Sequence, residues 1–279
     1  MSAAPVAAPV REALGAATDA LRTAGVQTPH LDAELLLAAA TGSDPAALRA
    51  HEDGVVDPAA GRRFGAMVRR RLAREPVAYI LGRKGFRRLE LDVDPRVLIP
   101  RPETELLVEV AVELNPASVL DVGTGSGAVA LAVADELPEA RVVATDTSWA
   151  ALDVARANAE RLGLGKRISF QSGTLPAGER FDLVVANLPY VSEGEWRVLA
   201  AEIVRYEPRE ALVAGPTGLE AIERLLDEIA GGPARPGAIA LEVGAGQAAR
   251  VGELMRGTGF GQVEVRQDLA GIERVVVGR

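Results

Sequence analysis

The chain has 279 residues, of which 48% are hydrophobic and 25% are charged, the proportions of an ordinary globular protein. It has no cysteine and only two histidines, which excludes disulfides and leaves little material for a metal site or a catalytic triad. The net charge of −8 argues against broad nucleic-acid binding, and no apolar run is long enough to cross a membrane. We therefore expect a metal-free protein that is not bound to a membrane, and the lack of cysteine fits a reducing cytoplasm.

The first 84 residues predict a small bundle of short helices. Residues 1–10 lack the positive start and the apolar core of a targeting signal, and we expect a disordered tail there. Thr28-Pro29 is typical of an N-cap followed by proline at the first helical position, and Gly42 ends that helix. Four arginines on a later helix (Arg69, Arg70, Arg71 and Arg74) favour a solvated face over a docking surface for an acidic protein or RNA.

Residues 85–99 form the next predicted element, a β-hairpin linker in which apolar residues alternate with charged ones. Pro100-Arg101-Pro102 is then a rigid turn before a helix that runs to about Leu114.

Residues 100–279 form the second predicted domain, in which strands and helices alternate. Predicted strands cover 118–122, 141–144, 168–171, 181–186 and 238–243, and predicted helices begin near 128, 148, 219 and 247. This alternation is typical of an α/β fold with a doubly wound parallel sheet. Two further strands, 262–266 and 273–277, are separated by a short loop, so we expect an antiparallel hairpin at the sheet edge.

A glycine-rich turn joins the first of these strands to its helix. The sequence there is Asp121-Val122-Gly123-Thr124-Gly125-Ser126-Gly127, and glycines let the backbone approach a ligand closely. The turn also satisfies a dinucleotide pattern, and Asp146 after the next strand could bind ribose hydroxyls in either kind of site. Asp121, the early third glycine and the C-terminal hairpin favour S-adenosylmethionine over a dinucleotide.

The most informative stretch follows the strand at 181–186 and consists of Asn187, Leu188, Pro189 and Tyr190. Pro189 keeps this segment out of helix, so its carbonyl groups stay available next to the side-chain oxygen of Asn187. Tyr190 offers a ring that can stack on a planar group. These groups predict a site for a flat group that bears an –NH2, at the strand ends where open α/β sheets bind ligands.

Together these segments resemble the HemK/PrmC family of class I S-adenosylmethionine-dependent methyltransferases, which methylate a glutamine side-chain nitrogen in peptide chain release factors. The resemblance covers nearly the whole chain, and its most specific segments are Pro-Val-Ala-Tyr-Ile-Leu-Gly (76–82) and Pro-Arg-Pro-Glu-Thr-Glu (100–105). The family motif is usually Asn-Pro-Pro-Tyr, so Leu188 is a departure. Relatives also often carry Asp and a bulky residue where this chain has Gly173 and Thr174.

The resemblance implies a Rossmann-like methyltransferase domain (100–279) and an N-terminal substrate-recognition domain (1–84). It implies that the cofactor lies on residues Gly123, Thr124, Gly125, Ser126, Gly127, Asp146, Thr174 and Asn187 and leaves as S-adenosylhomocysteine. Residues 187–190 would bind the glutamine of the Gly-Gly-Gln loop of a class I release factor and act in catalysis, in a monomeric enzyme.

Two alternatives remain open from the sequence, whereas a catalytically silent binding module is disfavoured because Asn187, Pro189 and Tyr190 are all present. A ribosomal-protein glutamine, or an amino group of adenine or guanine, presents the same –NH2 geometry; Asn-Leu-Pro-Tyr is the form typical of ribosomal RNA adenine dimethyltransferases, although the acidic balance argues against nucleic acid. An NAD-dependent oxidoreductase is disfavoured because no proton donor is evident beside a hydride acceptor.

Overall fold

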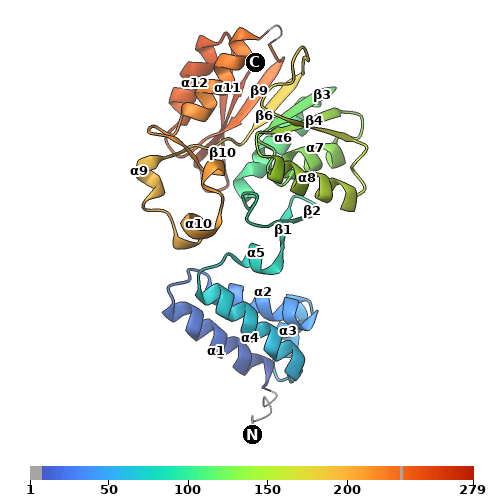
Figure 1. The fold of residues 1–279 in the computed structure, drawn as a ribbon, viewed down its shortest axis with the longest axis vertical. Helices are drawn as coiled ribbons and strands as arrows, with labels where there is room; N and C mark the ends of the chain where they lie inside the picture. Colours follow the sequence, from blue (N-terminus) through green and yellow to red (C-terminus); the bar gives the residue numbers. More distant parts are fainter. Residues whose placement is uncertain (1–7, 233–234) are drawn as a thin grey trace. The chain divides into compact units, whose positions relative to one another are not determined.

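A computed structural model describes residues 8–232 and 235–279, which divide into two compact units (Figure 1). We call them the helical unit, which is Met1–Gly82 together with Ala201–Tyr206, and the sheet unit, which is Arg83–Ala200 together with Glu207–Arg279. We expect a disordered tail at residues 1–10, and residues 1–7 of it lie outside the part of the chain that the structure describes. Its last residues are ordered, because Pro9 bridges Val55 and the Val10 amide donates to the Gly54 carbonyl at 2.8 Å.

The helical unit is built from short helices around an aliphatic core. Its elements are α1 (Val10–Thr23), α2 (Pro29–Thr41), α3 (Pro45–Ala50), α4 (Pro58–Leu72), α5 (Val77–Leu81) and α10 (Ala201–Tyr206). Leu21, Leu36 and Leu37 are fully buried between them. Pro29 at the first position of α2 and the left-handed Gly42 after it begin and end this helix where the sequence predicts, and α4 likewise begins with a proline, Pro58.

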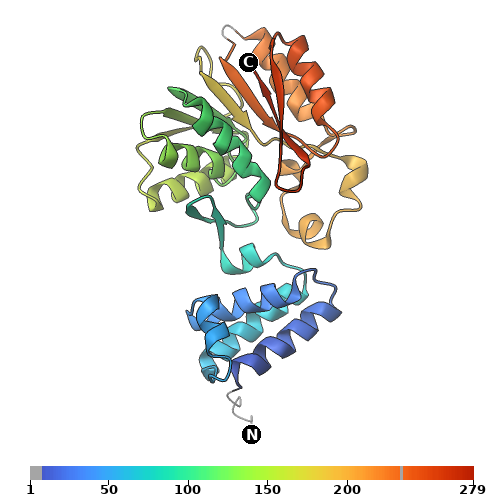
Figure 2. The ribbon, with the colours of Figure 1, turned by 180° about the vertical axis from the view of Figure 1, so that it is seen from behind.

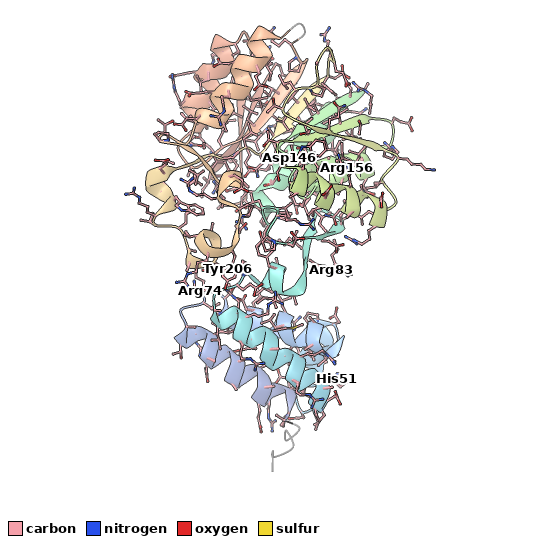
Figure 3. The ribbon with its side chains drawn as sticks, viewed as in Figure 1. His51, Arg74, Arg83, Asp146, Arg156 and Tyr206 are labelled. Atoms are coloured by element: carbon pink, nitrogen blue, oxygen red, sulfur yellow. The ribbon has the colours of Figure 1, made fainter. Side chains whose placement is uncertain are left out.

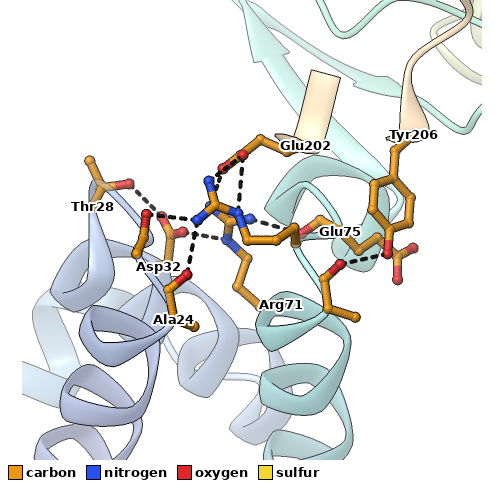
Figure 4. A network of polar contacts seen from close by, with 10 residues as sticks. Ala24, Thr28, Asp32, Arg71, Glu75, Glu202 and Tyr206 are labelled. Carbon is orange, nitrogen blue, oxygen red and sulfur yellow. Dashed lines mark hydrogen bonds and ion pairs between the residues drawn. The ribbon is translucent and has the colours of Figure 1, made fainter. Parts of the chain in front are cut away.

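A buried ion-pair network fixes α10 within the helical unit (Figure 4). Arg71 is only 5% exposed, and its guanidinium group donates to Asp32 at 2.7 Å and to Glu202 at 3.0 Å. Arg74 also donates to Glu202, and the Tyr206 hydroxyl donates to the Ala73 carbonyl. Although burial opposes it, hydrogen bonds from Arg74 and Arg71 lower the pKa of Glu202.

The predicted solvated arginine face is therefore wrong for Arg71. The local sequence places Arg71 on α4, but one of the acids that pair with it, Glu202, lies 131 residues later in the chain and could not be foreseen. Arg69 on the same helix is exposed, as expected.

The sheet unit is a seven-stranded mixed sheet with the order β10-β11-β9-β6-β3-β4-β5, which confirms the predicted fold class. The parallel strands are β3 (Ser118–Val122), β4 (Arg141–Asp146), β5 (Ile168–Ser172), β6 (Leu183–Ala186) and β9 (Ala238–Glu242). The hairpin of β10 (Val263–Gln267) and β11 (Glu273–Gly278) adds antiparallel strands at one edge (Figure 2).

Helices cover both faces of this sheet, so its central strands are buried throughout. On one face lie α6 (Glu105–Leu114), α7 (Ala128–Glu136) and α8 (Trp149–Arg161), and on the other lie α11 (Glu220–Gly231) and α12 (Ala248–Gly257). All residues of β6 and of β9 are buried, the pattern expected of parallel strands with two covered faces.

Shorter elements complete the sheet unit. They are β1 (Arg83–Phe86), β2 (Leu89–Asp92), η1 (Pro102–Thr104), β7 (Val191–Ser192), α9 (Glu193–Trp196), η2 (Arg209–Ala211) and β8 (Val213–Gly215). The hairpin of β1 and β2 ends at Asp92 rather than near residue 99 as expected, because the side-chain amide of Asn158 on α8 takes over the backbone bonds of Asp92. In the described part of the chain, no helix has the length and apolarity that crossing a membrane requires.

Candidate active site

A cavity lies where β3, β4 and β6 of the sheet unit end, and it joins the predicted sites. It is open to solvent, and the space not filled by protein atoms there, open solvent included, is about 1050 Å³. Its wall is formed by the glycine-rich turn, by Asp146 at the end of β4 and by Asn187, Leu188 and Pro189 after β6. The structure thus brings the predicted cofactor turn and the predicted –NH2 site to one cavity.

The three glycines of the turn all have left-handed backbones, with φ of 75°, 56° and 85° at Gly123, Gly125 and Gly127. A Cβ atom at Gly127 would lie 2.9 Å from Leu131, and one at Gly123 would lie 3.1 Å from Leu188. These two glycines therefore allow close packing, whereas Gly125 faces open space at the cavity. Gly125 is the glycine at which a ligand can approach the backbone most closely.

The buried carboxyl group of Asp121 supports the same turn. One of its oxygens accepts the Thr124 hydroxyl at 2.7 Å and the Ala130 amide at 3.1 Å. Burial raises the pKa of Asp121 to about 6, against the effect of these hydrogen bonds. Two predicted cofactor residues have structural contacts here as well: Thr124 through its hydroxyl, and Ser126 through its carbonyl, which accepts from Asn158.

Asp146 anchors the turn from the end of β4 (Figure 3). Its two oxygens accept the amides of Gly125 at 2.9 Å and of Ser148 at 2.8 Å. Burial raises its pKa, and the bonds from backbone amides oppose that shift. Because a carboxylate offers about four acceptor positions, Asp146 retains capacity for ligand hydroxyls.

Thr174 lies in the cavity wall, but its hydroxyl and its carbonyl already have partners. Its hydroxyl donates to Glu228 and its carbonyl accepts from Thr145 at 2.8 Å. Gly173 beside it has φ of 117° and open space around it. A planar group could therefore pack on this segment, with the Thr174 hydroxyl turned to Glu228.

Asn187 follows β6, and its side chain is oriented by Thr104 of η1. The Asn187 Nδ2 donates to the Thr104 Oγ1 at 3.0 Å. With its –NH2 held there, the amide presents its Oδ1 on the other side, as an acceptor. The Leu188 carbonyl receives no hydrogen bond from the described residues, so a second acceptor stands next to the first.

Tyr190 is held at both its backbone and its hydroxyl. Its carbonyl accepts from Gln247 at 3.0 Å, and its hydroxyl donates to Glu242 at 3.4 Å. Burial and the charge of Glu242 raise the pKa of this phenol. The phenol therefore stays protonated. Asn187, Leu188 and Pro189 line the cavity, but Tyr190 is not among its lining residues, so the structure does not bring this predicted site residue to the cavity wall.

The sequence patterns missed the polar residues behind this segment: Thr104, Glu242, Arg101 and Glu207. The buried Glu207 accepts the Ile99 amide at 3.1 Å and pairs with Arg101 at 2.5 Å, which closes the segment after β2 onto the cavity. The family-like segment at 100–105 could have pointed to two of them, because it contains Arg101 and Thr104, which no helix or strand periodicity explains.

These residues fit a cofactor that combines a ribose with a positive charge. Asp146 has acceptor capacity for paired hydroxyls, and Gly125 leaves room for a ligand at the backbone. Asp121 and Asp146 place two carboxyl groups in the cavity wall, where a cation is favoured.

Comparisons with known proteins identify two domains and the family of the chain. Residues 12–82 match the PrmC N-terminal domain model, and residues 102–215 match the methyltransferase small domain model. The chain is 42% identical to the release factor glutamine methyltransferase of Moorella thermoacetica, over 95% of this chain and 96% of the relative. It is 44% identical to the one of Burkholderia pseudomallei, over 89% and 91% of the two chains.

Solved structures share the fold at low identity. The hMettl16 catalytic domain, in complex with the MAT2A 3′UTR hairpin 6, is similar with a TM-score of 0.55 and 17% identity, over 67% of this chain and 74% of that one. A methyltransferase from Pyrococcus furiosus is similar with a TM-score of 0.51 and 18% identity, over 68% and 88% of the two chains.

Proposed function

We infer the activity of this chain from one premise: it belongs to the release factor glutamine methyltransferase family. It is an enzyme that uses S-adenosylmethionine, and we propose that it methylates the side-chain nitrogen of the glutamine in the Gly-Gly-Gln loop of class I release factors. The observation that carries this proposal is the single cavity shared by the glycine-rich turn and the acceptor pair of Asn187 and Leu188.

The cofactor assignment follows from the groups that line the cavity. We propose that the protein backbone at residues 123–127, and at Gly125 in particular, contacts the cofactor. We assign Asp146 to the ribose hydroxyls and Gly173-Thr174 to the adenine. Thr174 is assigned as a wall, because Glu228 already accepts its hydroxyl proton.

S-adenosylmethionine, when bound, supplies a methyl carbon made electrophilic by the adjacent sulfonium. The chain's own residues must solve a different problem, since the lone pair of an amide nitrogen is delocalised and poorly nucleophilic. The Asn187 Oδ1 and the Leu188 carbonyl can accept both N–H bonds of the glutamine, while Pro189 and Tyr190 pack against its plane. Positioning of this kind is worth roughly 7–11 kcal/mol in favourable cases.

The same two acceptors favour the positive charge that develops on nitrogen during transfer. The substrate then loses a proton. No general base is required for this loss, because an amide that is alkylated on nitrogen is strongly acidic.

We assign release-factor recognition to the N-terminal helical part, residues 1–84, and catalysis to residues 100–279, with the hairpin segment 85–99 between them. The match of residues 12–82 to the PrmC N-terminal domain supports the first assignment. We further propose that the enzyme works as a monomer in the cytoplasm, where its substrate acts in translation.

Incubation with labelled methyl donor tests the proposed substrate directly. Purified release factor, release factor with its Gly-Gly-Gln glutamine replaced by alanine, ribosomal proteins and RNA are offered separately. We expect label only on the unmodified release factor. Label on ribosomal protein or on RNA would instead assign the site to one of those substrates, and label on the alanine variant would reject the glutamine.

A further inference from the structure

The turn between β10 and β11 of the sheet unit presents only apolar residues to solvent. We call its four residues, Leu269, Ala270, Gly271 and Ile272, the apolar tip. All four are exposed, and Leu269 is 110% exposed, more than any other large hydrophobic residue among those that the structure describes. Hairpin turns are normally polar, and a run of exposed apolar residues is unfavourable unless it has a function.

Asp268 holds the apolar tip in one conformation. One oxygen of its carboxyl group accepts the amides of Ala270 and Ile272, both at 2.9 Å, and the other accepts the Arg274 Nε at 2.9 Å. The Asp268 amide donates to the Ile272 carbonyl at 2.8 Å, and Gly271 has the left-handed backbone, with φ of 78°, that closes the turn. The tip is therefore ordered before a partner binds, which lowers the entropic cost of binding.

The strand register places the apolar tip at the end of the sheet where the cavity lies (the red hairpin in Figure 2). β11 runs antiparallel to β9 with Val275 opposite Glu242, and β6 pairs with β9 in parallel, so that Asn187 is level with Glu242. The hairpin continues beyond this level by roughly 10 Å before it reaches Ile272. Because only β9 separates β6 from β11, these two strands are about 10 Å apart.

Packed groups join the acceptor segment to the hairpin. The Tyr190 hydroxyl donates to Glu242 at 3.4 Å, and the next residue along the chain, Val243, donates its amide to the Arg274 carbonyl at 2.8 Å. The side chain of Arg274 is paired with Asp268. A specific protein interface covers about 800 Å² on each partner, a patch roughly 30 Å across, so an interface centred on Asn187 includes the tip.

We propose that the apolar tip is a docking surface for the protein that carries the methyl-accepting glutamine, and that Leu269 and Ile272 pack against apolar groups beside the loop of that glutamine. The inference deepens the proposed function and rests on it for the identity of the partner. The tip carries no charge, and the arginines of its two strands, Arg266 and Arg274, are paired with acids, so nucleic acid phosphates find no contact here.

Leu269→Ser tests the surface in steady-state kinetics of the full chain, with purified release factor and labelled methyl donor. We expect KM for release factor to rise roughly tenfold, because a leucine is no longer buried on binding. The value of kcat should stay within about twofold, because the cavity is unchanged. The Kd for S-adenosylhomocysteine and the melting temperature should equal those of the wild type, since the side chain at 269 is fully exposed.

Val112→Ser is the matched control. Val112 is 39% exposed in the last turn of α6, which leads to the start of β3 at the opposite end of the sheet from the cavity. We expect its KM for release factor to equal that of the wild type.

The absence of cysteine from the chain allows a second measurement that needs no turnover. Leu269→Cys introduces the only thiol, and we expect bound release factor to slow its reaction with a maleimide at least fivefold. The thiol introduced by Val112→Cys should keep its rate. A benzophenone attached at position 269 should cross-link to release factor on irradiation.

The outcomes separate this surface from the proposed function. Either an unchanged KM in Leu269→Ser or an unprotected thiol in Leu269→Cys would overturn the docking surface, although methylation of release factor by the wild type would still support the proposed function. If the wild type labels no release factor, the proposed function fails, and the thiol assay still decides whether the tip contacts that protein. A cross-link between two copies of the enzyme would assign the tip to self-association and overturn the proposal.

Discussion

Buried acids occur in both units, and they are of two kinds: acids that pair with an arginine, which both units contain (Glu207 with Arg101 in the sheet unit), and acids without such a pair, of which the sheet unit has two. In the helical unit, Asp32 and Glu34 are each 5% exposed and each pairs with an arginine, Arg71 and Arg49 respectively. In the sheet unit, Asp121 and Glu242 are 2% and 1% exposed, and neither forms an ion pair with any described residue. Hydroxyl and amide groups contact them instead.

The presence or absence of an arginine partner separates buried acids that hold segments of the chain together from buried acids that lie at or beside the candidate active site. Where arginine neutralises the acid, the cost of burial is offset and a structural contact results. Where it does not, burial raises the pKa, to about 6 for Asp121 and about 7 for Glu242, and both residues adjoin the cavity or the segment that forms it. Perturbed acids of this kind are enriched at functional sites.

The largest expected effect is on the free energy of unfolding, when an arginine that pairs with buried acids is removed. Arg71→Ala should destabilise the protein by about 3–5 kcal/mol, because it leaves Asp32 buried and removes one partner of Glu202. Urea unfolding measures the change, and the exposed Arg69→Ala on the same helix should cost almost nothing. A small loss for Arg71→Ala would mean that the network adds little to stability.

The next effect concerns Asn187, the acceptor that we propose binds the substrate amide. Asn187→Ala should lower kcat roughly 10²–10³-fold, because one of the two acceptors for the substrate amide is lost. Calorimetry with S-adenosylhomocysteine should give nearly unchanged affinity, and the melting temperature should stay close to that of the wild type. Near-normal turnover in this variant would remove Asn187 from the mechanism.

A smaller effect concerns Glu242, the buried acid that has no arginine partner. Removing its charge should stabilise the protein, whereas Arg71→Ala should destabilise it. The pKa of Glu242 is about 7 in the folded state against an ordinary 4.5, so the folded state binds this proton more tightly. The resulting stabilisation is complete below pH 4.5 and is lost as the pH rises through 7. Glu242→Gln, which stays neutral, should therefore gain on the order of 3 kcal/mol over the wild type at pH 8 and almost nothing at pH 4.

Urea unfolding of both proteins at the two pH values measures this gain. A variant that is less stable than the wild type at pH 8 would show that Glu242 is a structural residue like Asp32.

The smallest effect concerns cofactor affinity. Asp146→Ala should raise the Kd for S-adenosylhomocysteine roughly 10- to 100-fold, as expected for lost hydrogen bonds to a charged group. The exposed Asp153→Ala on α8 serves as the control. Equal affinities of Asp146→Ala and the wild type, measured by calorimetry, would reject the ribose role.

Much of the fold could be predicted because its signals are local. Apolar runs such as Leu183–Ala186 predict buried strands. Pro29 and Pro58 mark the starts of two helices, and Gly42 marks the end of one. The glycine-rich turn and Asn187 were also visible, since each directly follows a strand.

The supporting residues could not be predicted, because their meaning depends on distant partners. Thr104 lies 83 residues from Asn187, and Tyr190 lies 52 residues from Glu242. Thr104 and Glu242 both fit their local patterns. Thr104 is typical of the start of a helix, and Glu242 is typical of the polar end of a strand. The burial of Arg71 was missed for the same reason, as Glu202 follows 131 residues later.

The hexapeptide 201–206 has a practical consequence for dissecting this protein. A fragment that stops at Gly82 would carry Arg71 and Arg74 without Glu202, and would lose the tyrosine that docks on Ala73. The helical unit is thus discontinuous in the sequence, and we expect that producing it alone requires the stretch Ala-Glu-Ile-Val-Arg-Tyr to be grafted back or supplied as a peptide.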